Sequence, residues 1–196
     1  MTIFDIDDRG LHRGAGKRAS AAVCRRFAAG LAVAMSVFAL QPAQAAEPDP
    51  VKIAVFDFQL DDRSAGGGIV DPDPIDAENL RLSTQEARRL LSESGRYSII
   101  EASGAADAVS AAGGLQNCDG CEVPLAKRLG ADQSLVGLVT RVSRTEYTLQ
   151  IVVKDVQSGA VLSDAFSGLR MGANYAWPRG VKSLIKNRVL AAQNAE

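Results

Sequence analysis

Hydrophobic and polar positions after residue 50 follow two periods, one typical of strands and one of helices. The almost uninterrupted apolar segment 53–58 predicts a buried strand. In Tyr147 to Asp155, apolar and polar residues alternate, which predicts a strand with one buried face. Three shorter apolar segments predict further strands, at 97–100, 135–142 and 160–168.

Helical spacing and end signals predict four helices. The first covers 76–94, with Asp76 as its N-cap and Gly95 as its stop. The others are predicted at 105–112, from Glu122 to Gly130, and from Trp177 onward. The element order predicts an α+β fold, described as an α/β sandwich. We expect a mixed β-sheet of about five strands, with a C-terminal antiparallel meander and a cover of three to four helices.

The N-terminal segment has the composition of a secretory signal. Six Arg and Lys residues precede a 14-residue apolar segment, Phe27 to Leu40, and Ala43-Gln44-Ala45 offers a small-x-small cleavage site. A membrane-spanning helix needs roughly 20 residues, so we expect cleavage rather than an anchor. The predicted organisation is a cleaved signal over 1–45, a polar leader over 46–50 and one domain over 51–192.

Cleavage would change the available chemistry. The single histidine, His12, lies in the predicted signal, so residues 46–196 cannot build a Ser-His-Asp triad. Cys24 also precedes the apolar segment and cannot carry a lipoprotein lipid, so we expect no lipid anchor. Residues 46–196 contain 16 Lys and Arg against 20 Asp and Glu, and this acidic balance argues against a nucleic-acid partner.

An acidic segment follows the first predicted strand. Residues 60–76 break both periods and predict a long mobile loop. Its carboxylates could surround a hard cation such as Ca²⁺, although the pattern departs from an EF-hand loop at Ile75 and Leu82. The alternative is a solvated loop that caps the following helix. The candidate cation ligands are Asp61, Asp62, Asp71, Asp73, Asp76 and Glu78.

Cys118 and Cys121 are the two cysteines after the predicted signal, and in an oxidising compartment such a pair usually forms a disulfide. A redox role is also open, since a following helix could activate a thiolate; however, thioredoxin-like motifs follow a strand, and this one does not. A zinc site would lack further His or Cys ligands, and haem attachment would need a histidine where Glu122 stands. We expect a structural disulfide and no metal or cofactor.

Several segments together resemble a known family. They are Val55-Phe56-Asp57-Phe58 after the predicted signal, a helix ending in Gly95-Arg96-Tyr97, Leu129-Gly130-Ala131-Asp132 leading to Val136-Gly137, Asp155-Val156 with Ser158-Gly159, and Ala112-Gly113-Gly114-Leu115 through Cys118-x-x-Cys121-Glu122. The set resembles a family of uncharacterised secreted proteobacterial proteins. It is more distantly similar to the N-terminal domain of TolB and to the envelope domains of CsgG and LpoB. The resemblance implies a periplasmic location and work through protein–protein contacts.

These observations favour a non-catalytic periplasmic accessory or adaptor protein. We expect a protein partner from the envelope or periplasm, no catalytic residues and no stable membrane insertion after cleavage. The last predicted strand of the meander, 160–168, could form an open edge that accepts a strand of the partner. The alternative is a periplasmic thiol–disulfide or electron-transfer accessory protein that uses Cys118 and Cys121.

Overall fold

The computed structural model describes residues 49–69, 73–118, 120–143, 145–170 and 176–192. The predicted signal, 1–45, and residues 46–48 of the predicted leader lie outside these ranges. All the described residues belong to one compact unit. Among them, no helix combines the length and the apolar character that crossing a membrane requires.

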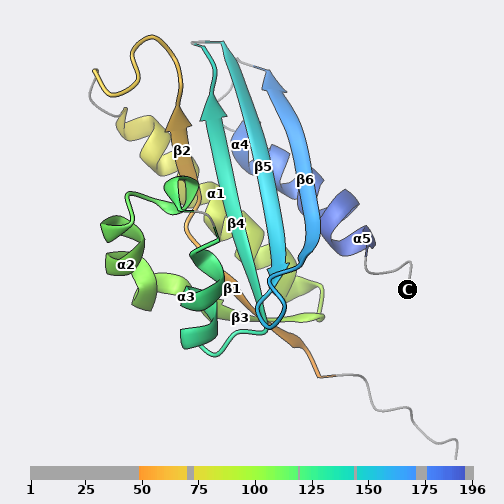
Figure 1. Ribbon diagram of the computed structural model, residues 1–196. Helices are drawn as coiled ribbons and strands as arrows, with labels where there is room; N and C mark the ends of the chain where they lie inside the picture. The colour runs from red at the N-terminus through yellow and green to blue at the C-terminus, as the bar shows by residue number, and fades with distance from the viewer. Residues whose placement is uncertain (1–48, 70–72, 119, 144, 171–175, 193–196) are drawn as a thin grey trace, which may run out of the picture. The chain divides into compact units, whose positions relative to one another are not determined.

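A six-stranded mixed sheet forms the centre of the fold (Figure 1). Its order is β3-β1-β4-β5-β6, and β2 pairs with β4 beyond the end of β1. β1 is parallel to β3 and β4, whereas β4, β5 and β6 form an antiparallel meander. The strands are β1 (Val51–Val55), β2 (Gln59–Asp62), β3 (Tyr97–Glu101), β4 (Gln133–Arg141), β5 (Glu146–Asp155) and β6 (Val161–Arg170). The predicted α+β fold is confirmed, including its meander.

Helices pack on both faces of the sheet at β1, and this strand shows how the sequence supports the arrangement. Ile53 shares a buried cluster with Leu91 and Val181, from the two helices on one face. Its neighbour Ala54 points the other way, into a second cluster with Leu125. The first face is covered by α1 (Pro74–Glu93) and by α4 (Ala176–Leu184), which continues through a π-helical segment (Ile185–Val189) into α5 (Leu190–Ala192); the second face is covered by α2 (Ala106–Ala111) and α3 (Glu122–Arg128).

The predicted loop 60–76 is wrong at its start, because Gln59–Asp62 forms strand β2. β1 ends at Val55, the chain bends, and β2 continues along the same partner strand, β4. At the bend, the Phe58 backbone N–H donates to Thr84 Oγ1 of α1 over 2.9 Å. A Cβ on Gly137 of β4 would overlap the Phe58 ring, so a glycine is needed where this ring packs on the sheet.

The predicted N-cap of the first helix is also wrong. Asp73, not Asp76, caps α1, because its side chain accepts a hydrogen bond from the Ile75 backbone N–H over 2.9 Å. Pro74 occupies the first turn, where its missing N–H leaves no helical bond unmade. Asp76 is the third residue of α1. Only 8% of its surface is exposed, and its carboxylate contacts the Arg141 guanidinium.

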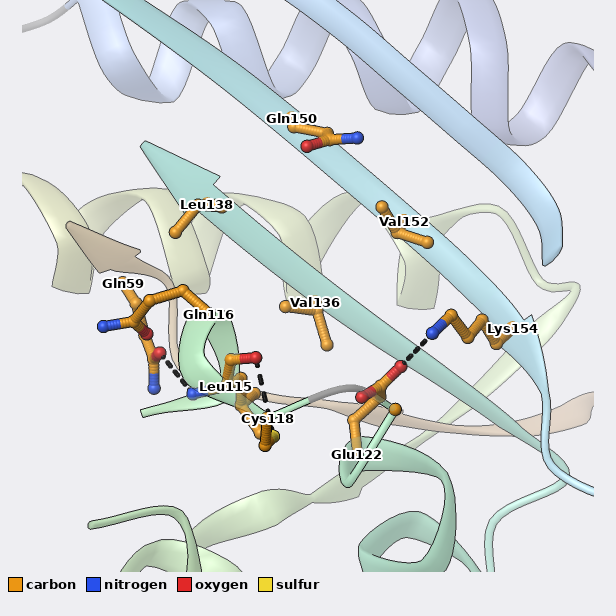
Figure 2. A pocket seen from close by; sticks show the side chains of 11 residues that line it. Gln59, Leu115, Gln116, Cys118, Glu122, Val136, Leu138, Gln150, Val152 and Lys154 are labelled. Carbon is orange, nitrogen blue, oxygen red and sulfur yellow. Dashed lines mark hydrogen bonds and ion pairs between the residues drawn. The ribbon is translucent and has the colours of Figure 1, made fainter. Parts of the chain in front are cut away.

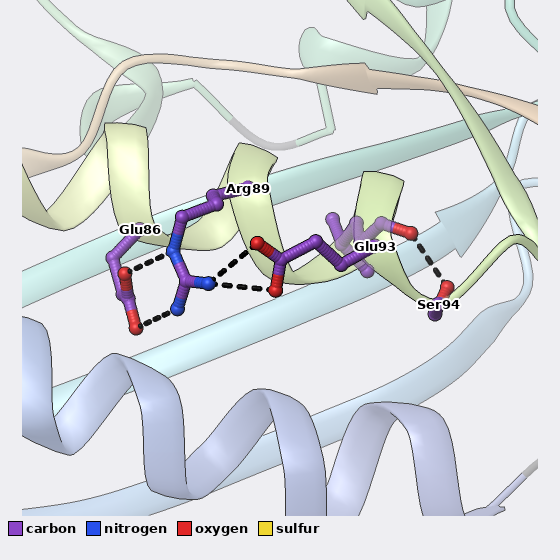
Figure 3. A network of polar contacts seen from close by, with 5 residues as sticks. Glu86, Arg89, Glu93 and Ser94 are labelled. Carbon is purple, nitrogen blue, oxygen red and sulfur yellow. Dashed lines mark hydrogen bonds and ion pairs between the residues drawn. The ribbon is translucent and has the colours of Figure 1, made fainter.

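Surface ion pairs support α1 along its outer side (Figure 3). Arg89 donates to both oxygens of Glu86 and to both oxygens of Glu93, over 2.6–2.9 Å. The bond from Arg89 lowers the pKa of Glu86, and Lys182 and Lys186 act in the same direction. Because Arg89 is exposed to solvent, water screens these pairs and each contributes little to the stability of the helix.

Candidate functional site

A disulfide closes the turn that precedes α3. Cys118 and Cys121 are bonded, with their Cα atoms 5.6 Å apart. Gly120 between them has a φ of 79°, a left-handed conformation that favours glycine. Cys118 Sγ lies 3.5 Å from the Leu115 carbonyl oxygen. A disulfide sulfur has no proton to donate, so this approach is a packing contact.

The bond also decides what the Cys pair can ligate. Cys118, Cys121 and Glu122 place their ligand atoms within 4.8 Å of one another, the sort of grouping that could hold a metal. However, metal ligation needs thiolates, and the disulfide leaves neither sulfur in that form. A disulfide is the form expected both of a structural link and of the oxidised state of a redox pair, so the structural role stays a prediction.

A small groove lies on the sheet beside this turn (Figure 2). Its volume is about 180 Å³, below the roughly 300–1,000 Å³ typical of small-molecule sites. Val136 and Leu138 of β4 and Val152 of β5 form an apolar floor, and Gln150 adds an amide. Such a lining suits contact with a side chain of another molecule better than proton transfer.

The wall of the groove is held by an ion pair between distant parts of the chain. Lys154 Nζ of β5 lies 2.6 Å from Glu122 Oε1, at the start of α3. The Glu122 side chain is only 7% exposed and that of Lys154 is 22% exposed. A charge that is so nearly buried depends on its partner, so the pair ties α3 to the sheet.

A hydrogen bond holds the end of the groove opposite to the ion pair. Gln59 Oε1 of β2 accepts from the Leu115 backbone N–H over 2.8 Å. Figure 2 shows this bond and the Lys154–Glu122 pair at two ends of the same groove. The segment between Leu115 and Glu122 is thus pinned to the sheet at both ends and braced by the disulfide.

β6 forms the outer edge of the meander, as the sequence predicted for this strand. Phe166 is 64% exposed, and Val161 and Leu162 are also exposed. Phe166 pairs in register with Gln150, so its ring and the groove lie on the same side of the sheet. We name this side the open face and define it by Val136, Leu138, Gln150, Val152 and Phe166.

The described carboxylates of the predicted cation site point to different partners. Asp61 lies 2.5 Å from Arg63 Nε, and Glu78 pairs with Arg81. Asp62 and Asp76 both contact Arg141, and Asp73 caps α1 as described above. Asp71 lies outside the described residues. A Ca²⁺ ion would therefore have to displace arginines, and calorimetry with Ca²⁺ is the measurement that decides this prediction.

The Arg141 contacts form a cluster that sequence patterns did not indicate. Arg141 Nη1 lies 2.7 Å from Asp62 Oδ2, Nε donates to Tyr147 Oη over 3.0 Å, and Nη2 contacts Asp76. The Ser64 hydrogen bonds, with help from Arg141, lower the pKa of Asp62. The cluster joins β2, β4, β5 and α1, and it uses acids that the sequence suggested for a cation.

Comparison with known proteins places the chain in a family. The family model DUF3280, described as a protein of unknown function (DUF2380), matches residues 51–189. The chain belongs to this family. A search of curated proteins finds no match to this chain. Membership confirms the predicted resemblance to an uncharacterised family and assigns no reaction.

Solved structures provide more distant likenesses within this fold. The LpoB C-terminal domain from Salmonella enterica is 14% identical, with a TM-score of 0.41, covering 64% of this chain and 87% of that domain. Lipoprotein GNA1162 from Neisseria meningitidis is 17% identical, with a TM-score of 0.44 and coverages of 75% and 98%. TolB from Acinetobacter baumannii is 13% identical, with a TM-score of 0.32 and coverages of 71% and 29%. LpoB and TolB are thus two proteins that the sequence resemblance had named.

Proposed function

We propose that this member of the DUF3280 family is a non-catalytic accessory protein of the bacterial periplasm that binds another protein along β6 and the open face. The observation that carries the proposal is that the ten-residue strand β6 lies at the edge of the sheet and that its Phe166 side chain is 64% exposed. An edge strand offers unpaired backbone donors and acceptors to a partner strand, and neighbouring pockets add specificity.

The groove supplies such a pocket. It lies over β4 and β5, two to three strand spacings inside a segment paired with β6, so a neighbouring part of the same partner that crosses the open face could insert a side chain there. Its volume of about 180 Å³ suits one inserted side chain, and buried anchors of this kind provide most of the binding energy in protein interfaces.

Two features support the proposed compartment. The predicted signal would direct the chain out of the cytoplasm, and the bonded pair Cys118–Cys121 is typical of proteins in oxidising compartments. An accessory protein in the periplasm would meet envelope and periplasmic partners. Cell fractionation, with N-terminal sequencing of the purified protein, tests the location and the cleavage at residue 45 together.

Site-specific photocrosslinking in living cells tests the proposed surface. A photoreactive amino acid replaces Phe166 in the full chain, and the same amino acid at Leu82 on α1 is the matched control, since Leu82 is also exposed. We expect a defined crosslinked partner at position 166, absent at position 82 and stable to reducing agent. Equal crosslinking at both positions, or none at position 166, would contradict the proposal.

The same experiment examines the thiol–disulfide alternative. A redox accessory protein would hold its partner through Cys118 or Cys121, so a complex trapped without irradiation would disappear under reducing conditions. Replacing both cysteines by serine would then abolish capture, whereas a protein that binds through β6 should keep its partner. The two functions therefore give opposite results with one pair of samples.

A further inference from the structure

The edge of β6 has few of the features that keep edge strands apart. Monomeric proteins protect such edges with proline, with several charges, with bulges or with short strands. β6 is ten residues long and contains no proline. The register shift in its pairing with β5 lies near its start, opposite Val153 and Lys154, and leaves the strand regular from Ser163 onward.

We infer that β6 pairs with β6 of a second copy of this chain, in an antiparallel arrangement around a two-fold axis at Ser167. The inference rests on the proposed function, because both use the β6 edge. The inference identifies one molecule that pairs with the β6 edge. It also implies that a second copy and a different partner compete for this edge, because self-pairing covers the backbone groups that a heterologous strand needs.

Charge complementarity selects the position of the axis. In a two-fold antiparallel pair, residues equally distant from the axis lie opposite each other. An axis at Ser167 brings Asp164 of each copy opposite Arg170 of the other. An axis at Asp164 would instead bring the two aspartates together. Opposite charges in directly opposed positions stabilise strand pairs, and like charges destabilise them.

The apolar positions agree with this register. Phe166 faces Gly168 of the other copy, and the two Phe166 rings lie diagonally across the axis, within the reach of aromatic side chains. Nothing lies within 4 Å of the position that a Cβ on Gly168 would occupy, so the ring has free space there. Pairing would thus cover a ring that is 64% exposed in the single chain.

Charge-reversal variants of the full chain, measured by sedimentation equilibrium over a range of concentrations, test the pairing. We expect the unmodified protein to dimerise. Asp164→Arg alone should raise the dimer dissociation constant roughly tenfold or more, because two attractive pairs become repulsive. Arg170→Asp should act in the same direction, and its thermal midpoint is measured alongside because the new carboxylate also lies opposite Glu146 of β5. The double reversal should restore dimerisation to within about threefold of the unmodified protein, which a merely destabilised strand could not do.

Cysteine crosslinking tests the axis itself. Ser167→Cys places two thiols opposite each other at the axis, where strand pairs bring Cα atoms within disulfide range. Ser163→Cys is the matched control on the same strand and the same side. Across this axis the two control thiols would lie roughly 26 Å apart along the strands. We expect mild oxidation to crosslink the first variant and leave the second monomeric on a non-reducing gel.

The outcomes separate this inference from the proposed function. A chain that stays monomeric at every concentration, or a dimer that neither charge reversal weakens, overturns the pairing of two copies. A monomer that still crosslinks a heterologous partner through position 166 overturns the pairing of two copies and supports the proposed function. A dimer with the expected charge rescue but no heterologous partner supports the inference and contradicts the proposed function.

Discussion

Replacing Lys154 by methionine would leave the Glu122 carboxylate beside the groove without its counter-ion. The Glu122 side chain is 7% exposed, and Lys154 Nζ lies 2.6 Å from its Oε1. Methionine keeps most of the length and apolar surface of the lysine side chain, so the substitution chiefly removes the charge. The expected result is a loss of folding stability at neutral pH and a loosened segment between Leu115 and α3.

Two effects of opposite sign set the expected loss of folding stability. Removing one partner of a buried ion pair costs about 3–5 kcal/mol. Since Lys154 is 22% exposed, water reaches part of the site and lowers this cost. We expect a loss of about 2–3 kcal/mol at pH 7.

Chemical denaturation at pH 7 measures this loss. The double variant Glu122→Gln with Lys154→Met should recover at least half of the loss at pH 7, since no buried charge remains. A loss below about 0.5 kcal/mol, or a double variant no better than the single one, would refute the reasoning that this pair is a buried interaction.

Three further predictions concern folding stability. Gly137→Ala should cost about 1–3 kcal/mol because the new methyl group overlaps an aromatic ring, while Gly168→Ala, placed in open space, should change the thermal midpoint little. The Asp62 pKa is lowered in the folded protein, so stability should fall as the pH drops below roughly 4, and Asp62→Asn should flatten that fall in acid titrations. Replacing Cys118 and Cys121 together by serine should cost about 2 kcal/mol or less in urea unfolding, because the closed loop is very short.

Local pattern was enough to predict most of the elements. β5 alternates except at Val152, and its buried residues Leu149, Ile151 and Val153 lie on one face of the strand. α4 begins at Ala176, beside the predicted start at Trp177, because apolar spacing and a first-turn proline are local signals. Features that neighbouring residues decide can be predicted from the chain alone.

The errors and omissions involve residues far apart in the sequence. β2 was mistaken for loop because Gln59–Asp62 has little strand pattern of its own and is held by pairing with β4. Asp76 was expected to cap a helix, yet its carboxylate turns to Arg141, 65 positions away. Local propensity could not indicate either contact, because the energy of each comes from a distant partner.

The sequence by itself determined the compartment prediction, the order of the elements and the cysteine pair, since these depend on composition and short-range spacing. Tertiary structure decided which side chains meet. It placed Glu122 against Lys154, and it placed Phe166 and the groove on one open face at the end of the sheet. The reason is physical: the pairing of strands sets these neighbours, and strand pairing depends on the whole sheet rather than on any one segment.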